Sequence, residues 1–300
     1  MVSVFCALCA VFGALLNDDA KWLRRRLLST GAITIGSSTA AAALSPETSK
    51  SIIDERCQDE QSVSGAYFQA CMADSQRTFD WPAPVGRIFI EQGKYIRTDR
   101  AGDGEVVWNG AQLLADYEAR ILGPSGYFEG KRVIELGCGT ALPSIVASRF
   151  GVSSVLATDG SSDVVERAKH NIERNLLGAP PPAANSSGAS SLISCRKLLW
   201  TGNGVVAKEL ESAFDVVLAA DVLWVLFAQN LLAGTAKALL APRGEFLLCE
   251  TGHDGLPLPA ALDGFRSVAE GAGLAWEGTD SVPHQVDGFE SQVVRLRART

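Results

Sequence analysis

Alternating strand and helix patterns, which begin at residue 131, constrain the fold of this 300-residue chain more than any other feature. Apolar runs predict strands at residues 131–136, 155–158, 192–199, 214–220 and 245–249. Helical spacing of apolar residues predicts helices at 142–150, 163–176, 230–240 and 260–273, and a last strand pair is expected at 274–277 and 291–296. Such alternation is typical of an α/β fold with a doubly wound, mostly parallel sheet covered by helices on both faces.

Residues 51–125 form an N-terminal accessory segment ahead of the α/β domain, which we expect at residues 126–300. Alternation at 87–91, the turn-prone Gln92-Gly93 and a second run at 94–97 predict a β-hairpin. Apolar residues at helical spacing predict a helix over 109–121 with Asn109 as its cap. Three prolines at 180–182 and an Ala/Asn/Ser/Gly run indicate a mobile insertion at 178–190.

Residues 1–50 differ in composition from the rest of the chain. An uncharged apolar stretch at 2–16 precedes Lys21 and the arginines at 24–26, and residues 20–46 contain no acidic side chain. This pattern is typical of an organelle-targeting leader, for a plastid or a mitochondrion, and it also resembles a twin-arginine signal. A disordered extension, which would leave the protein in the cytoplasm, and an interfacial helix are the alternatives.

Charge and cysteine content exclude several classes of function. The formal net charge of −7 repels phosphate backbones, so we expect no nucleic-acid partner. No strongly apolar run of about 18 residues marks a spanning helix, so no stable membrane insertion is expected once the leader is removed. The seven cysteines show no disulfide framework, and Cys6 and Cys9 lack a second pair, so we expect no metal site. We expect a monomer.

A glycine turn follows the first predicted strand of the α/β domain. Glu135-Leu136-Gly137-Cys138-Gly139 ends that strand and opens a helix, the context in which backbone approaches a ligand closely. Asp159 ends the next strand, twenty residues after Gly139, where a carboxylate can accept both hydroxyls of a ribose. The combination predicts nucleoside binding.

The residues around this turn favour one nucleoside over another. A dinucleotide site needs a third glycine at the position that Leu142 occupies, and Glu135 would repel a pyrophosphate. S-adenosylmethionine carries an ammonium group, a sulfonium and a ribose, which suit Glu135 and Asp159. We therefore predict S-adenosylmethionine as the cofactor; a nicotinamide or flavin cofactor, or a tight turn that binds nothing, are the alternatives.

Five motifs in the same order resemble a known family. They are Val106-Val107-Trp108-Asn109-Gly110-Ala111, the strand and turn at 133–139, Asp159, Leu199-Trp200 and Ala219-Ala220-Asp221-Val222-Leu223-Trp224. From about residue 86 to the C-terminus the chain resembles the seven-strand protein lysine methyltransferases of the methyltransferase-like twenty-one group and their fungal nicotinamide-methyltransferase-like relatives. The resemblance implies a Rossmann-like methyltransferase fold with a seven-stranded sheet and an N-terminal hairpin and helix. It also implies that cofactor contacts come from Trp108, Gly137, Cys138, Gly139, Asp159, Trp200 (near the adenine) and Ala220, although both tryptophans could be ordinary core aromatics.

Asp221 and Trp224 are the predicted catalytic residues. They lie after a strand, at the carboxyl end where open α/β sheets bind ligands, and they match the family's acidic-x-x-aromatic slot with tryptophan in place of tyrosine or phenylalanine. Asp221 can orient an amine through its N–H groups, and Trp224 can form the wall of the acceptor channel. The alternative is that Asp221 caps the next helix. Val222 and Leu223 replace the prolines of nucleic-acid amino methyltransferases, which disfavours a base as the acceptor.

These features predict an N-methyltransferase whose acceptor is a lysine on a protein. Acidic groups expected near the substrate side, at residues 250, 254, 287 and 290, would suit a basic peptide, whereas His253 is either a proton acceptor or an ordinary surface residue. A small-molecule acceptor, such as a nicotinamide-like amine, and a non-catalytic cofactor-binding module are the alternatives.

Overall fold

A computed structural model describes residues 75–93, 103–176, 192–223, 226–251, 257–281 and 291–299. The chain divides into two compact units, Met1–Pro46 and Glu47–Thr300, and all described residues belong to the second. The expected leader at 1–50 and the expected insertion at 178–190 lie outside the described residues. Within the described segments, no helix combines the length and the apolar character needed to cross a membrane.

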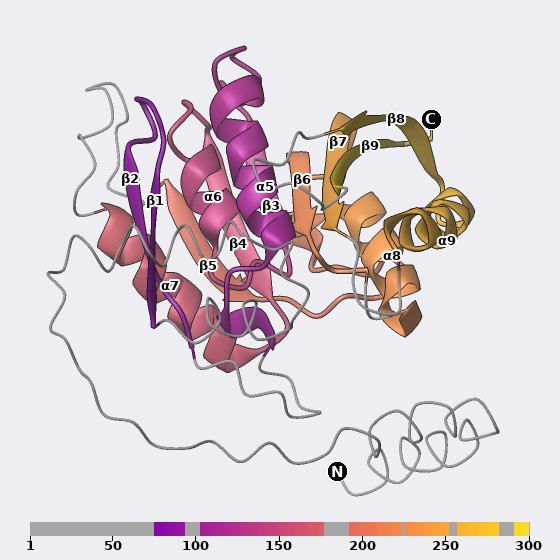
Figure 1. Ribbon diagram of the computed structural model, residues 1–300. Helices are drawn as coiled ribbons and strands as arrows, with labels where there is room; N and C mark the ends of the chain where they lie inside the picture. Colours follow the sequence, from indigo (N-terminus) through magenta and orange to yellow (C-terminus); the bar gives the residue numbers. More distant parts are fainter. Residues whose placement is uncertain are drawn as a thin grey trace, which may run out of the picture. The chain divides into compact units, whose positions relative to one another are not determined.

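A seven-stranded mixed sheet forms the centre of the fold (Figure 1). Its spatial order is β5-β4-β3-β6-β7-β9-β8. Strands β3 to β7 run parallel, β9 is antiparallel to β7, and β8 is antiparallel to β9. The strands are β3 (Arg132–Leu136), β4 (Ser154–Asp159), β5 (Ile193–Lys197), β6 (Phe214–Ala220), β7 (Leu240–Thr251), β8 (Leu274–Ser281) and β9 (Ser291–Ala298). The predicted doubly wound, seven-stranded fold is confirmed.

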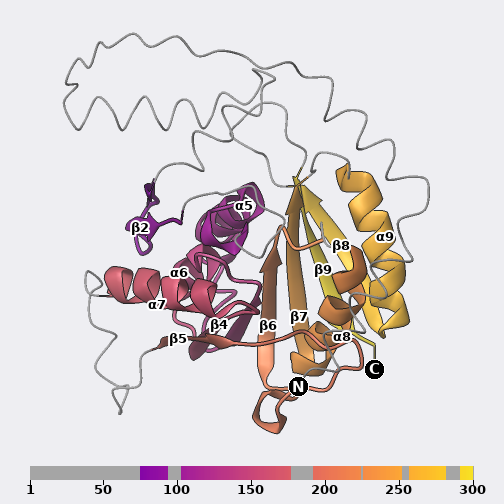
Figure 2. The same cartoon turned by 90° about the horizontal axis from the view of Figure 1, so that it is seen from below.

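Five α-helices of the described chain cover the two faces of this sheet (Figure 2). On one face lie α5 (Asn109–Tyr117), α6 (Leu142–Ala147) and α7 (Ser162–Leu176); on the other lie α8 (Gln229–Leu239) and α9 (Leu258–Gly271). Alternate strand residues feed the two cores because successive side chains of a strand point to opposite faces. Leu247 packs with the α5 side and Phe246 with the α8 and α9 side.

Short helical turns connect these elements. They are η1 (Asp103–Glu105), η2 (Glu118–Leu122, a π-helical turn that continues α5), η3 (Lys208–Leu210) and η4 (Leu226–Ala228). The sequence predicted Asn109 as the cap of α5, and this is wrong. Trp108 occupies the N-cap position, and its side chain makes no capping hydrogen bond. The Gly110 N–H instead donates to Asp221 Oδ2 at 2.6 Å. A residue distant in sequence therefore caps the helix.

The N-terminal hairpin is present, but the described partner of β2 is a strand that the sequence did not predict. β2 (Arg87–Glu91) pairs antiparallel with the upstream β1 (Gln76–Asp80). Gln92 and Gly93 do not form the hairpin turn, because their N–H groups donate to the carbonyls of Ser75 at 2.9 Å and Glu105 at 2.8 Å. The second predicted strand, 94–97, lies outside the described residues.

The hairpin is fastened to α7 by two buried asparagines. Asn171 Oδ1 accepts the Glu91 N–H at 2.8 Å, and Asn175 Oδ1 accepts the Phe89 N–H at 2.9 Å. Ile88 and Ile90 point into the same core as the central strands. The predicted accessory segment therefore shares its hydrophobic core with the sheet.

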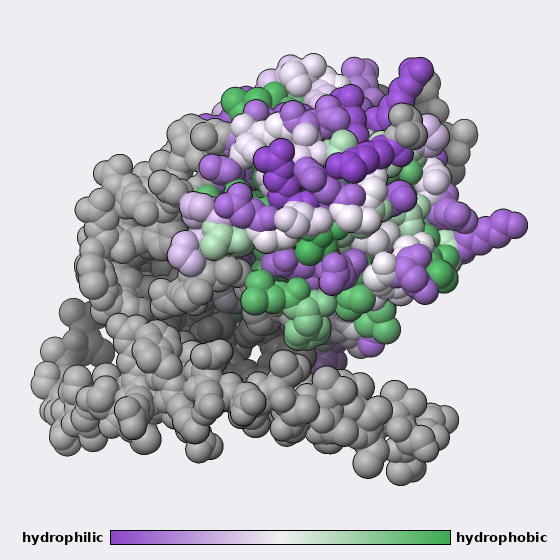
Figure 3. Space-filling view, turned by 90° about the vertical axis from the view of Figure 1, so that its right-hand side faces the viewer, coloured by the Kyte–Doolittle hydropathy of each residue, from purple (hydrophilic) through white to green (hydrophobic). Residues whose placement is uncertain are grey.

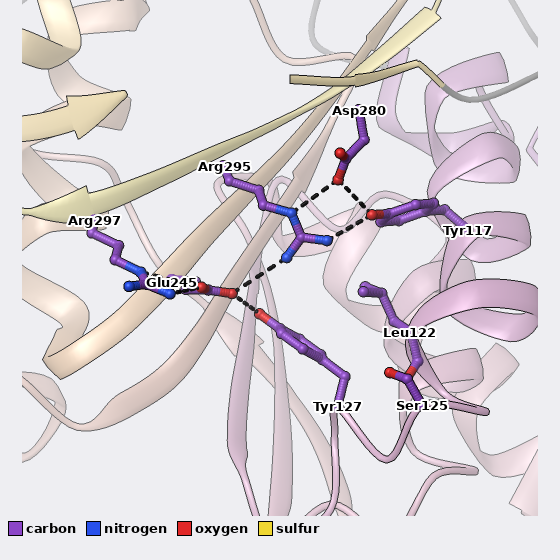
Figure 4. A network of polar contacts seen from close by, with 8 residues as sticks. All are labelled: Tyr117, Leu122, Ser125, Tyr127, Glu245, Asp280, Arg295 and Arg297. Atoms are coloured by element: carbon purple, nitrogen blue, oxygen red, sulfur yellow. Dashed lines mark hydrogen bonds and ion pairs between the residues drawn. The ribbon is translucent and has the colours of Figure 1, made fainter. Parts of the chain in front are cut away.

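A polar network joins the end of α5 to the edge of the sheet (Figure 4). The Tyr117 hydroxyl donates to Asp280 Oδ2 on β8 at 2.6 Å and accepts from the Arg295 guanidinium on β9 at 2.6 Å. Arg295 also donates to Asp280 at 2.9 Å, while Tyr127 donates to Glu245 on β7 at 2.6 Å. The Tyr117 hydroxyl, and then Arg295, lower the pKa of Asp280. The side of the molecule that carries β8 and α9 is mostly hydrophilic in the upper part of the view, with hydrophobic residues below (Figure 3).

Tyr117→Phe should lower the free energy of unfolding by about 1–2 kcal/mol, because it removes a hydroxyl with two charged partners. Urea unfolding of the variant, of Asp280→Asn and of the double variant would measure the effect as a cycle. We expect a coupling of at least about 0.5 kcal/mol between the two sites. Losses that simply add would contradict the network.

Candidate active site

The glycine turn after β3 requires glycine for both conformation and space. Gly137 and Gly139 have φ of +70° and +50°, in the left-handed region that favours glycine. A Cβ on Gly137 would lie 3.0 Å from Val222 Cγ1 and 3.3 Å from Trp200 Cζ2. A Cβ on Gly139 would lie 3.0 Å from the Gly104 carbonyl oxygen. The turn therefore lies against three segments distant in sequence.

Asp159, the last residue of β4, lies beside this turn as predicted. Its Oδ2 accepts the Gly139 N–H at 3.3 Å and its Oδ1 accepts the Ser161 N–H at 2.9 Å. Burial raises the pKa of the carboxyl, while the backbone donors act in the opposite direction. Each carboxylate oxygen can accept a second hydrogen bond, so two adjacent hydroxyls could bind here.

Glu135 lies under the turn and is only 1% exposed. Its carboxyl accepts the N–H of Ser144 at 3.0 Å and the hydroxyl of the same residue, in the first turn of α6. Burial raises its pKa to about 8. Sequence reasoning missed Ser144 as the partner of Glu135. Contact between Glu135 and a cofactor ammonium stays a prediction; a cation arriving there would favour the ionised carboxylate.

The other predicted cofactor residues lie around the same edge of the sheet. Trp200 is partly buried and lies against Gly137, Ala220 ends β6 and is 9% exposed, and Trp108 directly precedes α5. The Cys138 N–H donates to Thr158, and a hydrogen bond to Cys195, together with burial, raises the pKa of the Cys138 thiol. Cys138 therefore contributes backbone rather than a reactive thiolate.

Asp221 follows β6 and joins three parts of the fold. Its backbone is left-handed, with φ of +49°, and the residue is 4% exposed. Oδ2 accepts the Gly110 N–H at 2.6 Å, and Oδ1 accepts the N–H and the hydroxyl of Thr251 at 2.9 and 2.8 Å. A Cβ on Gly110 would lie 2.6 Å from the Asp221 carboxyl carbon, so the motif needs glycine there.

Asp221 caps the preceding α5. A cap of the next helix, the alternative drawn from the sequence, stays a prediction. Contact between Asp221 and an acceptor amine stays a prediction. Its predicted partner Trp224, and His253, lie outside the described residues.

Residues 94–253 match a protein-family model described as lysine methyltransferase. The chain belongs to this family. The lysine methyltransferase family is a group of class I S-adenosylmethionine-dependent enzymes, which confirms the resemblance drawn from the five motifs and the cofactor that it implied.

Two curated relatives and one solved structure show the range of this likeness. A protein N-terminal and lysine N-methyltransferase of Yarrowia lipolytica is 28% identical over 58% of this chain and 66% of its own length. A calmodulin-lysine N-methyltransferase of Arabidopsis thaliana is 35% identical over 38% of this chain and 34% of its own. The chain thus spans less than two thirds of either relative. Trm5b of Pyrococcus abyssi is 14% identical, with a TM-score of 0.45, over 75% of this chain and 56% of that one.

Glu250, near the end of β7, has a place in this methyltransferase fold that sequence reasoning missed. It was expected among the acidic groups near the substrate side, and it is fully buried. Its Oε1 accepts the N–H groups of Val222 and Leu223 at 2.7 and 3.0 Å, and burial raises its pKa, as does the charge of Asp221. The other expected acidic groups, at 254, 287 and 290, lie outside the described residues.

Proposed function

We propose that this protein transfers the methyl group of S-adenosylmethionine to the side-chain amine of a lysine in a protein substrate. One observation supports this most: the segment that begins with Asp221 adjoins the glycine turn, since Val222 Cγ1 would lie 3.0 Å from a Cβ on Gly137. A cofactor on the turn would therefore have the acceptor segment as its neighbour. Membership of the lysine methyltransferase family supports the same acceptor class.

The residues present fit the cofactor. The close approach of Trp200 and Val222 to Gly137 makes a cradle that any Cβ would fill, and an indole face there suits an adenine ring. The Asp159 carboxylate, already aligned by Gly139 and Ser161, would accept the ribose hydroxyls. When bound, S-adenosylmethionine supplies an electrophilic methyl group on a sulfonium.

The chain itself must then position a neutral amine and exclude water. Methyl transfer is an in-line displacement, so the amine nitrogen must stand about 3 Å from the methyl carbon. The Asp221 carboxylate can accept N–H hydrogen bonds from the amine and so direct its lone pair. Its bonds to Gly110 and Thr251 keep it from rotating, so little order has to be created when the substrate binds.

Transfer of a labelled methyl group tests this function. The full-length protein would be incubated with labelled S-adenosylmethionine and a protein extract, and separately with the small-molecule filtrate of that extract. We expect label in a protein band that hydrolyses to methyl-lysine. Label on an N-terminal amine would move the acceptor to the other group in the name of the Yarrowia relative. Label confined to the filtrate, or cofactor binding without transfer, would contradict the proposal.

Asp159→Ala should weaken S-adenosylmethionine binding by at least about tenfold, because two ribose hydroxyls would lose a charged acceptor. Calorimetry with the purified variant measures the change. Asp215→Ala is the matched control, since Asp215 is a half-buried aspartate paired with Arg132 at the opposite end of the sheet. Equal affinities of the two variants would remove Asp159 from the cofactor site.

A further inference from the structure

At the ends of two neighbouring strands, a carboxylate of each accepts hydrogen bonds from the other. β6 and β7 pair in parallel up to Ala220 and Cys249. Beyond this pair, Asp221 of the β6 side accepts two hydrogen bonds from Thr251, at the end of β7. Glu250 of β7 in turn accepts the two N–H groups that follow Asp221. Each strand end is therefore held by a carboxylate of the other.

The segment Asp221-Val222-Leu223 is consequently fixed at every residue. Its first residue adopts a left-handed conformation, which costs a residue with a Cβ about 1 kcal/mol, so its neighbours must hold it there. Leu223 is bound on both sides: its N–H donates to Glu250, and its carbonyl accepts from Gln229 Nε2 at 3.0 Å. The next residue in the chain is Trp224.

Packing alone does not explain an acid at position 250. Phe246 and Leu248, on the same face of β7, are apolar and fully buried, and an apolar residue would fill this place at lower cost than a carboxyl. Oε2 of Glu250 has no hydrogen-bond partner among the described residues, so the two bonds made by Oε1 are what the acid contributes.

We propose that Glu250 is a positioning residue of the acceptor side: by holding the N–H groups of Val222 and Leu223, it sets the orientation of the Asp221 carboxylate. This inference rests on the proposed function for its consequence in catalysis. The hydrogen-bond clamp itself is independent of that function.

Three variants distinguish the loss of the two hydrogen bonds from a loss of charge and from a general loss of stability. Glu250→Gln keeps a carbonyl oxygen that can accept both N–H groups but removes the charge. Glu250→Leu has a similar size and no acceptor. Glu245→Leu is the matched control, because Glu245 lies on the same strand about 16 Å away, bonded to Tyr127 and Arg297.

Amide hydrogen exchange at Val222 and Leu223, S-adenosylmethionine affinity, and kcat and KM for a protein acceptor would be measured on each. In Glu250→Leu we expect exchange at both amides to rise at least about tenfold and kcat to fall about tenfold, with cofactor affinity changed less than about threefold. In Glu250→Gln, amide exchange and kcat should both lie within about threefold of the wild-type values. Glu245→Leu should lower the unfolding midpoint and change neither amide exchange at Val222 and Leu223 nor kcat.

Unchanged amide protection in Glu250→Leu would overturn the inference, as would a Glu250→Gln variant that is protected but inactive, because charge would then be the essential property. Should Glu250→Leu fail to fold, Glu250→Asp replaces it: the shorter side chain withdraws the acceptor, and faster exchange with lower kcat is again expected. Wild-type protein that methylates no protein would overturn the proposed function, while the exchange data would still decide the clamp.

Discussion

Asp221→Ala should lower kcat/KM for the acceptor about 100-fold while changing S-adenosylmethionine affinity by less than about threefold. Hydrogen bonds to a charged group contribute about 1.5–3 kcal/mol each, and Asp221 accepts from Gly110 and Thr251 as well as, by proposal, from the amine. Steady-state kinetics with a protein that the wild type methylates would measure kcat/KM, and calorimetry would measure the affinity for S-adenosylmethionine.

Asp221→Asn is the matched control for backbone and shape. Asparagine tolerates the left-handed conformation at φ of +49° and keeps an oxygen for the Thr251 donors, so the local backbone should be retained, although its amide group replaces the acceptor of the Gly110 N–H. A large loss of kcat in Asp221→Asn would show that the charge is needed at the amine. Turnover unchanged in Asp221→Ala, with cofactor affinity retained, would remove Asp221 from the active site.

Gly137→Ala should weaken S-adenosylmethionine binding about 50-fold. The new methyl group would lie 3.0 Å from Val222 and 3.3 Å from Trp200, so both side chains must shift and the cradle between them fills. Crowding of this kind costs about 1–3 kcal/mol. Calorimetry or equilibrium dialysis gives the dissociation constant directly.

Gly130→Ala separates crowding from backbone strain. Gly130 has φ of +68°, close to the +70° of Gly137, but no atom lies within 4 Å of the position its Cβ would take. Both variants should therefore lose a similar stability from the left-handed backbone, about 1 kcal/mol. Only Gly137→Ala should lose cofactor affinity; equal affinities would contradict the placement of the cofactor on the turn.

Elements with strong local signals were predicted closely. The apolar run 214–220 coincides with β6 (Phe214–Ala220), and the helix predicted at 163–176 differs from α7 by one residue. β7 begins at Leu240, five residues before its predicted start. The prediction was late because Pro242-Arg243-Gly244 has the composition of a turn. Arg243 does take a left-handed φ of +68°, yet the strand continues through it. Sheet pairing there outweighs local preference.

The partner of β2 was predicted on the wrong side of it in sequence. Alternation identified β2, but nothing in residues 92–97 reveals that the Gln92 side chain accepts the Val107 N–H at 2.7 Å. The partner in the structure, β1, directly precedes β2 and is joined to it by the turn at 81–86, where the Trp81 N–H donates to the Gly86 carbonyl.

In the candidate site, too, some residues were predicted from local sequence signals and others were missed. Gly137 and Gly139 follow β3 and Asp159 ends β4, the next strand, so their spacing in sequence was enough to place them together. The roles of Asp221 as cap of α5 and of Glu250 as clamp depend on contacts across 111 and 28 residues. Glu250 was expected to supply charge near the substrate side, whereas it is a buried acceptor of two backbone N–H groups; the short apolar run of β7 did not reveal its burial.

The antiparallel direction of β9 has a consequence for substitutions at this end of the sheet. Ser281 of β8 pairs with Gln292, and Ser291 pairs with Thr251, so the chain leaves β8 and re-enters β9 beside the residue that Asp221 binds. The ends of β8 and β9 therefore lie on the proposed acceptor side, while Gly137 follows β3 and Asp159 ends β4 in the other half of the sheet. A substitution at the β8–β9 end of the sheet would therefore reach the proposed acceptor side without passing through the strands beside the glycine turn.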